Sequence, residues 1–126
     1  MKFLKAFAAG LFLFVALAAA PQQAFAYCAV APFYFPYFGS NTSTTMDANS
    51  GQPCAIDASS GGTAYMQSVT VAARPRHGSV SIGDGFVVTY QSRRGYTGPD
   101  SFAYAVRGSA PSGTGTSIVR VRVTVQ

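Results

Sequence analysis

The chain has 126 residues and a mass of 13.1 kDa, which leaves room for one small domain. Nearly half of the residues are hydrophobic, 10% are charged and 13 are glycine, so the composition excludes a disordered, collagen-like or coiled-coil protein. The formal net charge is +5, but both lysines lie within the first five residues. Residues 27–126 carry seven arginines and four aspartates, and a net charge of +3 is small for a protein that binds polyanions, nucleic acid among them.

The first 26 residues have the three parts of a secretory signal peptide. A basic start precedes an uncharged apolar stretch over residues 6–20, and the small-residue site Ala24-Phe25-Ala26 follows. The apolar stretch ends at Pro21, short of the roughly 20 residues that a membrane-spanning helix needs. We therefore expect cleavage after Ala26 and a secreted or periplasmic mature protein without a membrane span.

Two cysteines, Cys28 and Cys54, follow the expected cleavage site. In an exported small protein such a pair is typical of a disulfide, which would contribute about 3 to 4 kcal/mol by closing the loop between them. A zinc site would need two further ligands, whereas His77 is the single histidine of the sequence. The sequence thus predicts a structural disulfide, no metal site and no cofactor.

Residues 27–52 differ in composition from the rest of the chain. The first part, residues 27–38, is interrupted by Pro32 and Pro36, which permit only an edge strand or an extended arm. The second part, residues 39–52, is polar and rich in turn residues, and we interpret it as a long loop. Residues 27–38 are also rich in tyrosine and phenylalanine. If these aromatic side chains are exposed, they could bind sugars or proteins at little entropic cost; alternatively, they could cover a sheet edge. The candidate partner-binding residues of the arm are Phe33, Tyr34, Phe35, Tyr37 and Phe38.

Residues 53–126 show the pattern of a β-domain. Short alternating segments are separated by glycine, serine and proline clusters, and the alternation is clearest in residues 119–125, where valines alternate with Arg120, Arg122 and Thr124. Six or seven strands at this spacing predict an all-β, immunoglobulin-like antiparallel β-sandwich, with a small β-barrel as the alternative. Besides the last strand, we expect these residues to point inward: Cys54, Ile56, Ser59, Val69, Val71, Val80, Ile82, Phe86, Val88, Tyr90, Phe102, Tyr104 and Val106.

A sequence motif in residues 74–106 resembles a known family. It comprises Pro75-Arg76-His77-Gly78, then Val88-Thr89-Tyr90, then Gly95-Tyr96-Thr97-Gly98-Pro99-Asp100-Ser101-Phe102-Ala103-Tyr104. The arrangement is similar to the bacterial immunoglobulin-like, cadherin-like tandem-repeat domains of surface proteins and adhesins. The resemblance implies a fold rather than an activity. The calcium-binding segments of true cadherins are absent from the sequence, so calcium dependence is not expected.

The motif also has a physical interpretation of its own. Glycines 78, 95 and 98 fall where strands turn and a positive φ is expected, and Asp100 can cap a turn through its carboxylate. His77 is the side chain that titrates near neutral pH, but it has no neighbouring nucleophile. We therefore expect a structural histidine and no catalytic residue.

The arginines form the other candidate site. Arg93 and Arg94 share one loop, while Arg120 and Arg122 share the solvent face of the last strand. Guanidinium groups bind sulfate, phosphate and carboxylate groups bidentately, so these four residues are candidates for polyanion binding. The alternative is that they keep exposed strands soluble and discourage edge pairing.

Together these observations favour a non-enzymatic, secreted or periplasmic module that contacts a protein or polysaccharide of the cell envelope or matrix. We expect three segments: a signal peptide over residues 1–26, the arm and loop over residues 27–52, and the sandwich over residues 53–126. The alternative function is a small extracytoplasmic enzyme or enzyme inhibitor. The sequence does not specify the oligomeric state.

Overall fold

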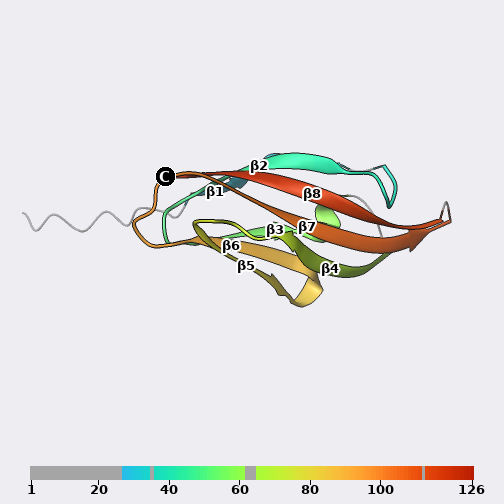
Figure 1. Ribbon diagram of the computed structural model, residues 1–126. Coiled ribbons are helices and arrows are strands. Elements are labelled where there is room, and N and C mark those ends of the chain that lie inside the picture. Colours follow the sequence, from blue (N-terminus) through green and yellow to red (C-terminus); the bar gives the residue numbers. More distant parts are fainter. Residues whose placement is uncertain (1–26, 35, 62–64, 112) are drawn as a thin grey trace, which may run out of the picture.

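Two β-sheets packed face to face form the protein (Figure 1). The computed structural model describes residues 27–34, 36–61, 65–111 and 113–126, so the expected signal peptide and Phe35 lie outside the described residues. The strands are β1 (Cys28–Val30), β2 (Thr42–Ala48), β3 (Pro53–Asp57), β4 (Met66–Ala73), β5 (Gly78–Gly83), β6 (Val87–Ser92), β7 (Gly98–Ala110) and β8 (Gly113–Val125).

The larger sheet has the strand order β1-β2-β8-β7-β4, and the smaller sheet has the order β3-β6-β5. Among the described strands, all pairings are antiparallel except that between β2 and β8, which is parallel. Two short 3₁₀ turns, η1 (Ala58–Gly61) and η2 (Asp84–Phe86), connect strands of the sandwich. The arrangement confirms the predicted immunoglobulin-like β-sandwich and excludes the closed barrel.

The longest feature of the molecule is the ribbon formed by β7 and β8. Each strand has 13 residues, and they pair from Gly98 opposite Val125 to Ala110 opposite Gly113. In Figure 1 this orange and red ribbon runs the length of the sandwich and extends beyond the smaller sheet at the hairpin end. The ribbon is therefore the element against which the other parts of the fold are positioned.

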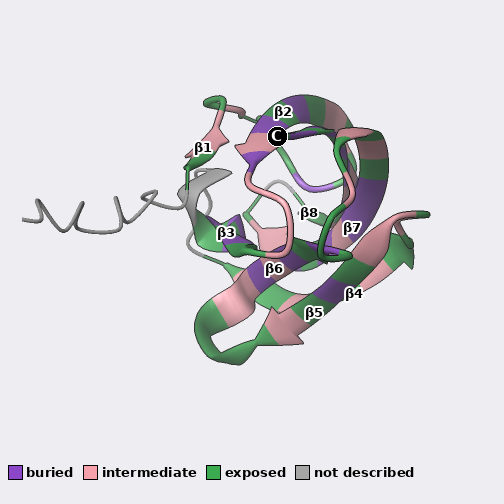
Figure 2. Ribbon diagram, turned by 90° about the vertical axis from the view of Figure 1, so that its left-hand side faces the viewer, coloured by how far each residue is buried: buried purple, intermediate pink, exposed green. Residues whose placement is uncertain are grey.

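Alternation along the strands builds the core, as the banding of buried and exposed residues in Figure 2 shows. The buried apolar residues that the pattern predicted are Cys54, Ile56, Val69, Val80, Val88, Tyr90, Phe102, Tyr104, Val106, Val119, Val121, Val123 and Val125. Val71 and Ile82 are partly buried and pack against this core. The prediction for Ser59 is wrong, because Ser59 is exposed and Ala58 takes the interior position at the start of η1.

Phe86 does not belong to a strand, in contrast to the expectation. It lies in η2 with a φ of 62°, is partly buried, and precedes the first residue of β6. β5 and β6 form a hairpin in which Gly83 pairs with Val87. Phe86 is therefore the last residue of the turn that connects the two strands.

The interpretation of residues 39–52 as a loop is wrong, because they contain β2. Thr44, Met46 and Ala48 are buried on one side of this strand, while Ser43 and Thr45 are exposed on the other. The alternation is hidden in the sequence, since Thr, Met and Ala are weaker indicators of a strand than Val or Ile. Pairing with β8 from Thr42 opposite Val119 to Ala48 opposite Val125 supplies the backbone hydrogen bonds that stabilise the strand. With β1 and β2, the described chain has eight strands against the six or seven expected.

A disulfide closes one rim of the sandwich. Cys28 in β1 and Cys54 in β3 belong to different sheets, and their sulfur atoms are 2.00 Å apart with a Cα–Cα distance of 5.4 Å. The predicted pairing is confirmed. The bond ties the edge strand β1, which the prolines of the arm permitted, directly to the smaller sheet.

Candidate functional site

Asp100 organises the end of the sandwich opposite the β7–β8 hairpin. Its Oδ1 accepts hydrogen bonds from the backbone N–H groups of Arg76 (3.1 Å) and Ser101 (2.9 Å). Its Oδ2 accepts one from the backbone N–H of His77 (3.1 Å) and one from the Tyr90 hydroxyl (2.8 Å). The carboxylate therefore joins β7 to β6 and to the chain that enters β5. This confirms the prediction that Asp100 caps a turn, and it shows that the same carboxylate also links the two sheets.

These bonds perturb both ionisable partners. Burial by itself raises the pKa of Asp100, but the hydrogen bonds from Tyr90 and from the three backbone N–H groups outweigh it and hold the pKa below its ordinary value. Burial, and then the hydrogen bond to the carboxylate, raise the pKa of Tyr90. At neutral pH the pair is thus a neutral phenol donating to a carboxylate.

His77 lies beside this group and is held by its neighbours. Its ring stacks on Tyr96 with 4.0 Å between centroids and 3° between planes, and its backbone carbonyl accepts a hydrogen bond from Arg93 N–H (2.8 Å). Gly95 and Gly98 flank Tyr96 with φ values of 88° and 129°, a conformation that favours glycine. The contacts of His77 are those expected of a structural residue.

Gly78 is needed for a different reason from the one expected. It has no positive φ; instead, a Cβ at this position would lie 2.3 Å from the carbonyl oxygen of Gln91. The glycine permits close approach of β5 and β6 just after His77. The motif thus contains two glycines with a positive φ, Gly95 and Gly98, and one, Gly78, that permits two strands to lie close together.

The aromatic arm divides into buried and exposed rings. Phe38 is 7% exposed and covers Gly108 and Gly115 of the ribbon, where an added Cβ would lie 2.2 Å from its ring and 2.5 Å from its carbonyl oxygen, respectively. The Ser117 hydroxyl holds the arm by accepting from Gly39 N–H (3.0 Å) and donating to the Tyr37 carbonyl (3.3 Å). Of the residues proposed for partner binding, Phe38 is therefore an anchor in the core.

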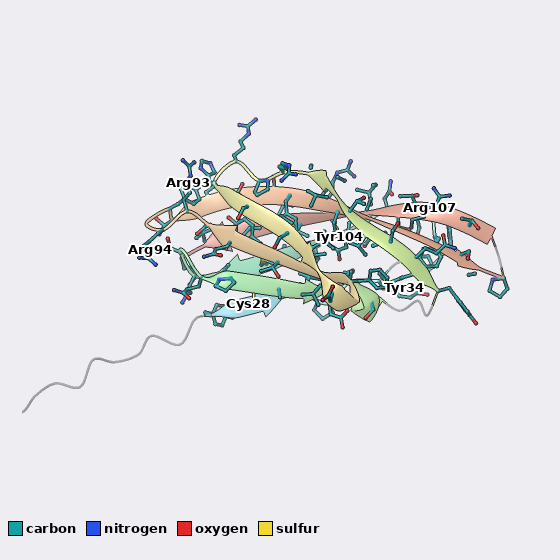
Figure 3. All side chains as sticks on the ribbon, turned by 90° about the horizontal axis from the view of Figure 1, so that it is seen from below. Cys28, Tyr34, Arg93, Arg94, Tyr104 and Arg107 are labelled. Carbon is teal, nitrogen blue, oxygen red and sulfur yellow. A yellow bond between two sulfur atoms is a disulfide. The ribbon has the colours of Figure 1, made fainter. Side chains whose placement is uncertain are left out.

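Three tyrosines remain exposed around this anchor. Tyr34 is 66% exposed, Tyr37 is 57% exposed and Tyr65 is 58% exposed. Tyr65 belongs to this end because its carbonyl oxygen accepts from Ser109 N–H of the ribbon (3.1 Å), and Tyr34 lies toward the end at which β4 begins (Figure 3). We call Tyr34, Tyr37 and Tyr65 the tyrosine group. Nothing in the sequence around Tyr65 singles it out, and it comes close to the arm only through the tertiary fold.

Phe33 is partly buried and helps to line an open hollow of about 300 Å³ between the arm and β3. Its walls are mostly apolar and come from Val30, Ala31, Pro32, Phe33, Ala55, Ile56 and Asp57. The arm therefore packs along the smaller sheet instead of extending into solvent.

The four arginines proposed for polyanion binding occupy two places. Arg93 and Arg94 lie in the loop after β6, at one end of the molecule (Figure 3), and the Arg93 side chain donates to the Arg76 carbonyl (3.3 Å). Arg120 and Arg122 lie on the outer face of the larger sheet, as the alternation predicted. Arg74, at the end of β4, joins this second pair in lining one trough.

The described residues contain no group of three His, Cys, Asp or Glu side chains that could hold a metal ion. In the part of the chain that the structure describes, no helix is long and apolar enough to cross a membrane.

Residues 36–124 match the family model described as a bacterial Ig domain. The match covers well over half of the chain, so the protein belongs to the bacterial Ig domain family, as the motif around Asp100 indicated. Domains of this family are in general non-enzymatic structural or binding modules. No curated protein matches the chain.

Proposed function

We propose that this protein is a secreted or periplasmic, non-enzymatic module that binds a protein or polysaccharide of the cell envelope or matrix. The disulfide between Cys28 and Cys54 supports an oxidising compartment, because such bonds persist outside the cytoplasm. The bacterial Ig family supports a binding or structural role.

The observation that carries the proposal is the tyrosine group on its buried anchor. Phe38 fixes the arm to the ribbon, so Tyr34 and Tyr37 are presented from an ordered backbone together with Tyr65. Rings that are already positioned lose little conformational entropy on binding, which is why tyrosine is favoured in binding surfaces.

The test is capture of envelope or matrix material by the oxidised protein and by the variant Tyr34→Ser/Tyr37→Ser/Tyr65→Ser. We expect the variant to lose the captured component and to keep its thermal unfolding midpoint, since the three side chains are exposed. Tyr27→Ser is the control, because Tyr27 is 54% exposed but precedes β1 at the other end of the larger sheet. Capture that survives in the triple variant, or that fails equally in the control, would refute this role of the tyrosine group.

A further inference from the structure

An open trough of about 450 Å³ crosses the outer face of the larger sheet. Its lining comes from four strands and the residue after β4, and consists of Ser43, Ala73, Arg74, Ser101, Phe102, Ala103, Arg120, Val121 and Arg122. Phe102 and Val121 are buried and point into the sandwich, so they contribute mainly backbone to the floor. The side chains that reach the solvent are therefore arginines and small residues.

Strand register explains why the guanidinium groups are accessible. Arg120 lies opposite Ser43 of β2 and Ala103 of β7, and Arg122 lies opposite Thr45 and Ser101. Small neighbours on both sides leave the arginine side chains uncovered. The two residues are two positions apart on one strand, which places their Cβ atoms about 7 Å apart on the same face.

These charges are not neutralised within the protein. The side chains of Arg74, Arg120 and Arg122 make no hydrogen bond or ion pair with any other described residue, and no acidic residue lines the trough. Asp47 is the acidic residue of β2 on this face, two positions beyond the partner of Arg122. Since an arginine stays charged at all relevant pH values, the trough has an uncompensated positive charge.

A second open hollow extends the trough toward the end that holds Asp100. It shares Ser101 and Arg122 with the first and adds Arg76, His77, Pro99 and Asp100. The Asp100 carboxylate already accepts four hydrogen bonds, so it is engaged by the protein. The combined surface is elongated, with cations along it and serine hydroxyls on its floor.

We infer that this trough binds an anionic polysaccharide, whose carboxylate or sulfate groups pair with Arg74, Arg120 and Arg122 while sugar hydroxyls contact the serines. The elongated shape fits a polymer better than a single small anion, and guanidinium groups bind such oxygens bidentately. The lining presents no large exposed apolar side chain that would enter a lipid surface. The inference rests on the proposed function only in taking an envelope or matrix polymer as the partner, and its residues are separate from the tyrosine group.

The test measures affinity for polygalacturonate and dextran sulfate, with neutral dextran, anionic phospholipid vesicles and duplex DNA as the other arms. Arg120→Gln/Arg122→Gln is compared with Arg94→Gln/Arg107→Gln, which removes the same charge from two exposed residues outside the trough. We expect the trough variant to weaken binding to one of the acidic polysaccharides by about tenfold or more, and the control by about twofold. A loss of affinity for polygalacturonate identifies carboxylate as the recognised group, and a loss for dextran sulfate identifies sulfate.

Equal losses in the two variants would attribute binding to overall charge and would overturn the inference. So would failure of the wild-type chain to bind either acidic polymer, or tighter binding to vesicles or DNA. A matching unfolding midpoint for the two variants shows that the fold is intact. Envelope capture through the tyrosine group can persist in every one of these cases, so the two hypotheses fail independently.

Discussion

At one end of the β7–β8 ribbon the Asp100 carboxylate accepts four hydrogen bonds, whereas at the other end Phe38 packs its ring and backbone against Gly108 and Gly115. The first attachment depends on directional hydrogen bonds to a charged group, and the second depends on the close packing of a ring and backbone against two glycines. Because β7 and β8 lie between the other strands of the larger sheet, each attachment positions a different surface: the trough near Asp100 and the tyrosine group near Phe38. The comparison predicts that the two ends respond differently to mutation and to pH.

The largest effect is expected at the apolar end. Phe38→Ala removes a nearly buried ring and leaves a cavity above the two glycines, which should lower the free energy of unfolding by about 4 kcal/mol. Urea denaturation measures this change. Tyr37→Ala is the neighbouring control and should change stability by less than about 0.5 kcal/mol, because its side chain is exposed. A loss below about 1 kcal/mol for Phe38→Ala would show that the ring is not an anchor.

The glycines beneath Phe38 test the same contact from the other side. In Gly115→Ala the new Cβ would lie 2.5 Å from the Phe38 carbonyl oxygen, and backbone cannot yield as a flexible side chain can. We expect a destabilisation of about 2 to 3 kcal/mol by overpacking. Gly83→Ala is the control, since the nearest atom to its Cβ is 3.9 Å away and its φ is −104°. Similar melting temperatures for the two variants would contradict the close packing of the arm.

At the polar end, Asp100→Asn should lower the free energy of unfolding by about 2 kcal/mol, because an amide nitrogen cannot accept the bonds that a second carboxylate oxygen accepts. Asp84→Asn, at an exposed turn position, controls for the loss of one negative charge. Equal stability of the two variants would mean that the Asp100 hydrogen bonds contribute nothing to folding.

The same residue makes stability depend on pH. The folded pKa of Asp100 lies below its ordinary value of 3.8, so the unfolded chain binds a proton more readily than the folded chain as the solution is acidified. The stabilisation is fully present above pH 3.8 and is lost as the pH falls below it through the folded pKa. The difference in stability between wild type and Asp100→Asn, measured by denaturation at several pH values, should therefore shrink in acid. A constant difference would contradict the lowered pKa.

The smallest effect is expected midway along the ribbon, at Tyr104. Its ring is fully buried and its hydroxyl has no hydrogen-bond partner among the described residues, while burial and the nearby Asp57 charge raise its pKa. Tyr104→Phe should therefore raise the free energy of unfolding by about 1 kcal/mol, since it removes an unpaired buried hydroxyl. Tyr90→Phe removes a paired hydroxyl and should be destabilising. Destabilisation by both variants would indicate that the Tyr104 hydroxyl is hydrogen-bonded in solution.

The two ends also differ in how far the sequence predicted them. The motif around Asp100 uses residue types with strong local preferences, so the sequence correctly predicts the turn glycines Gly95 and Gly98, the capping carboxylate and the strands on either side. The prediction for Gly78 is wrong, because it has no positive φ and instead permits the close approach of two strands. The apolar end was largely missed. The sequence leaves open whether Phe38 is exposed or buried. It also indicates a loop at β2, because Thr44, Met46 and Ala48 lie in a polar, turn-rich segment and their pairing with β8 is not visible locally.

The candidate sites show the same division. Alternation in the last strand placed Arg120 and Arg122 on the solvent face, and the structure agrees. Their association with Arg74, and the separation of both from Arg94, depend on which strands are neighbours in the larger sheet. Tyr65 joins Tyr37 for the same reason, through the contacts of each with the ribbon.

By itself the sequence determined the all-β class, the inward faces of β3 to β8, the disulfide and the capping role of Asp100. These features could be predicted because hydrophobic alternation and turn residues are local patterns, and because two cysteines allow only one intramolecular pairing. The tertiary structure decided that β2 pairs in parallel with β8, that Phe38 is an anchor, and which arginines and tyrosines share a surface. These features depend on contacts between residues up to about 80 positions apart, such as Gly39 with Ser117. Strand pairing is set by the burial and backbone hydrogen bonds of the whole sandwich, which no local segment of sequence contains.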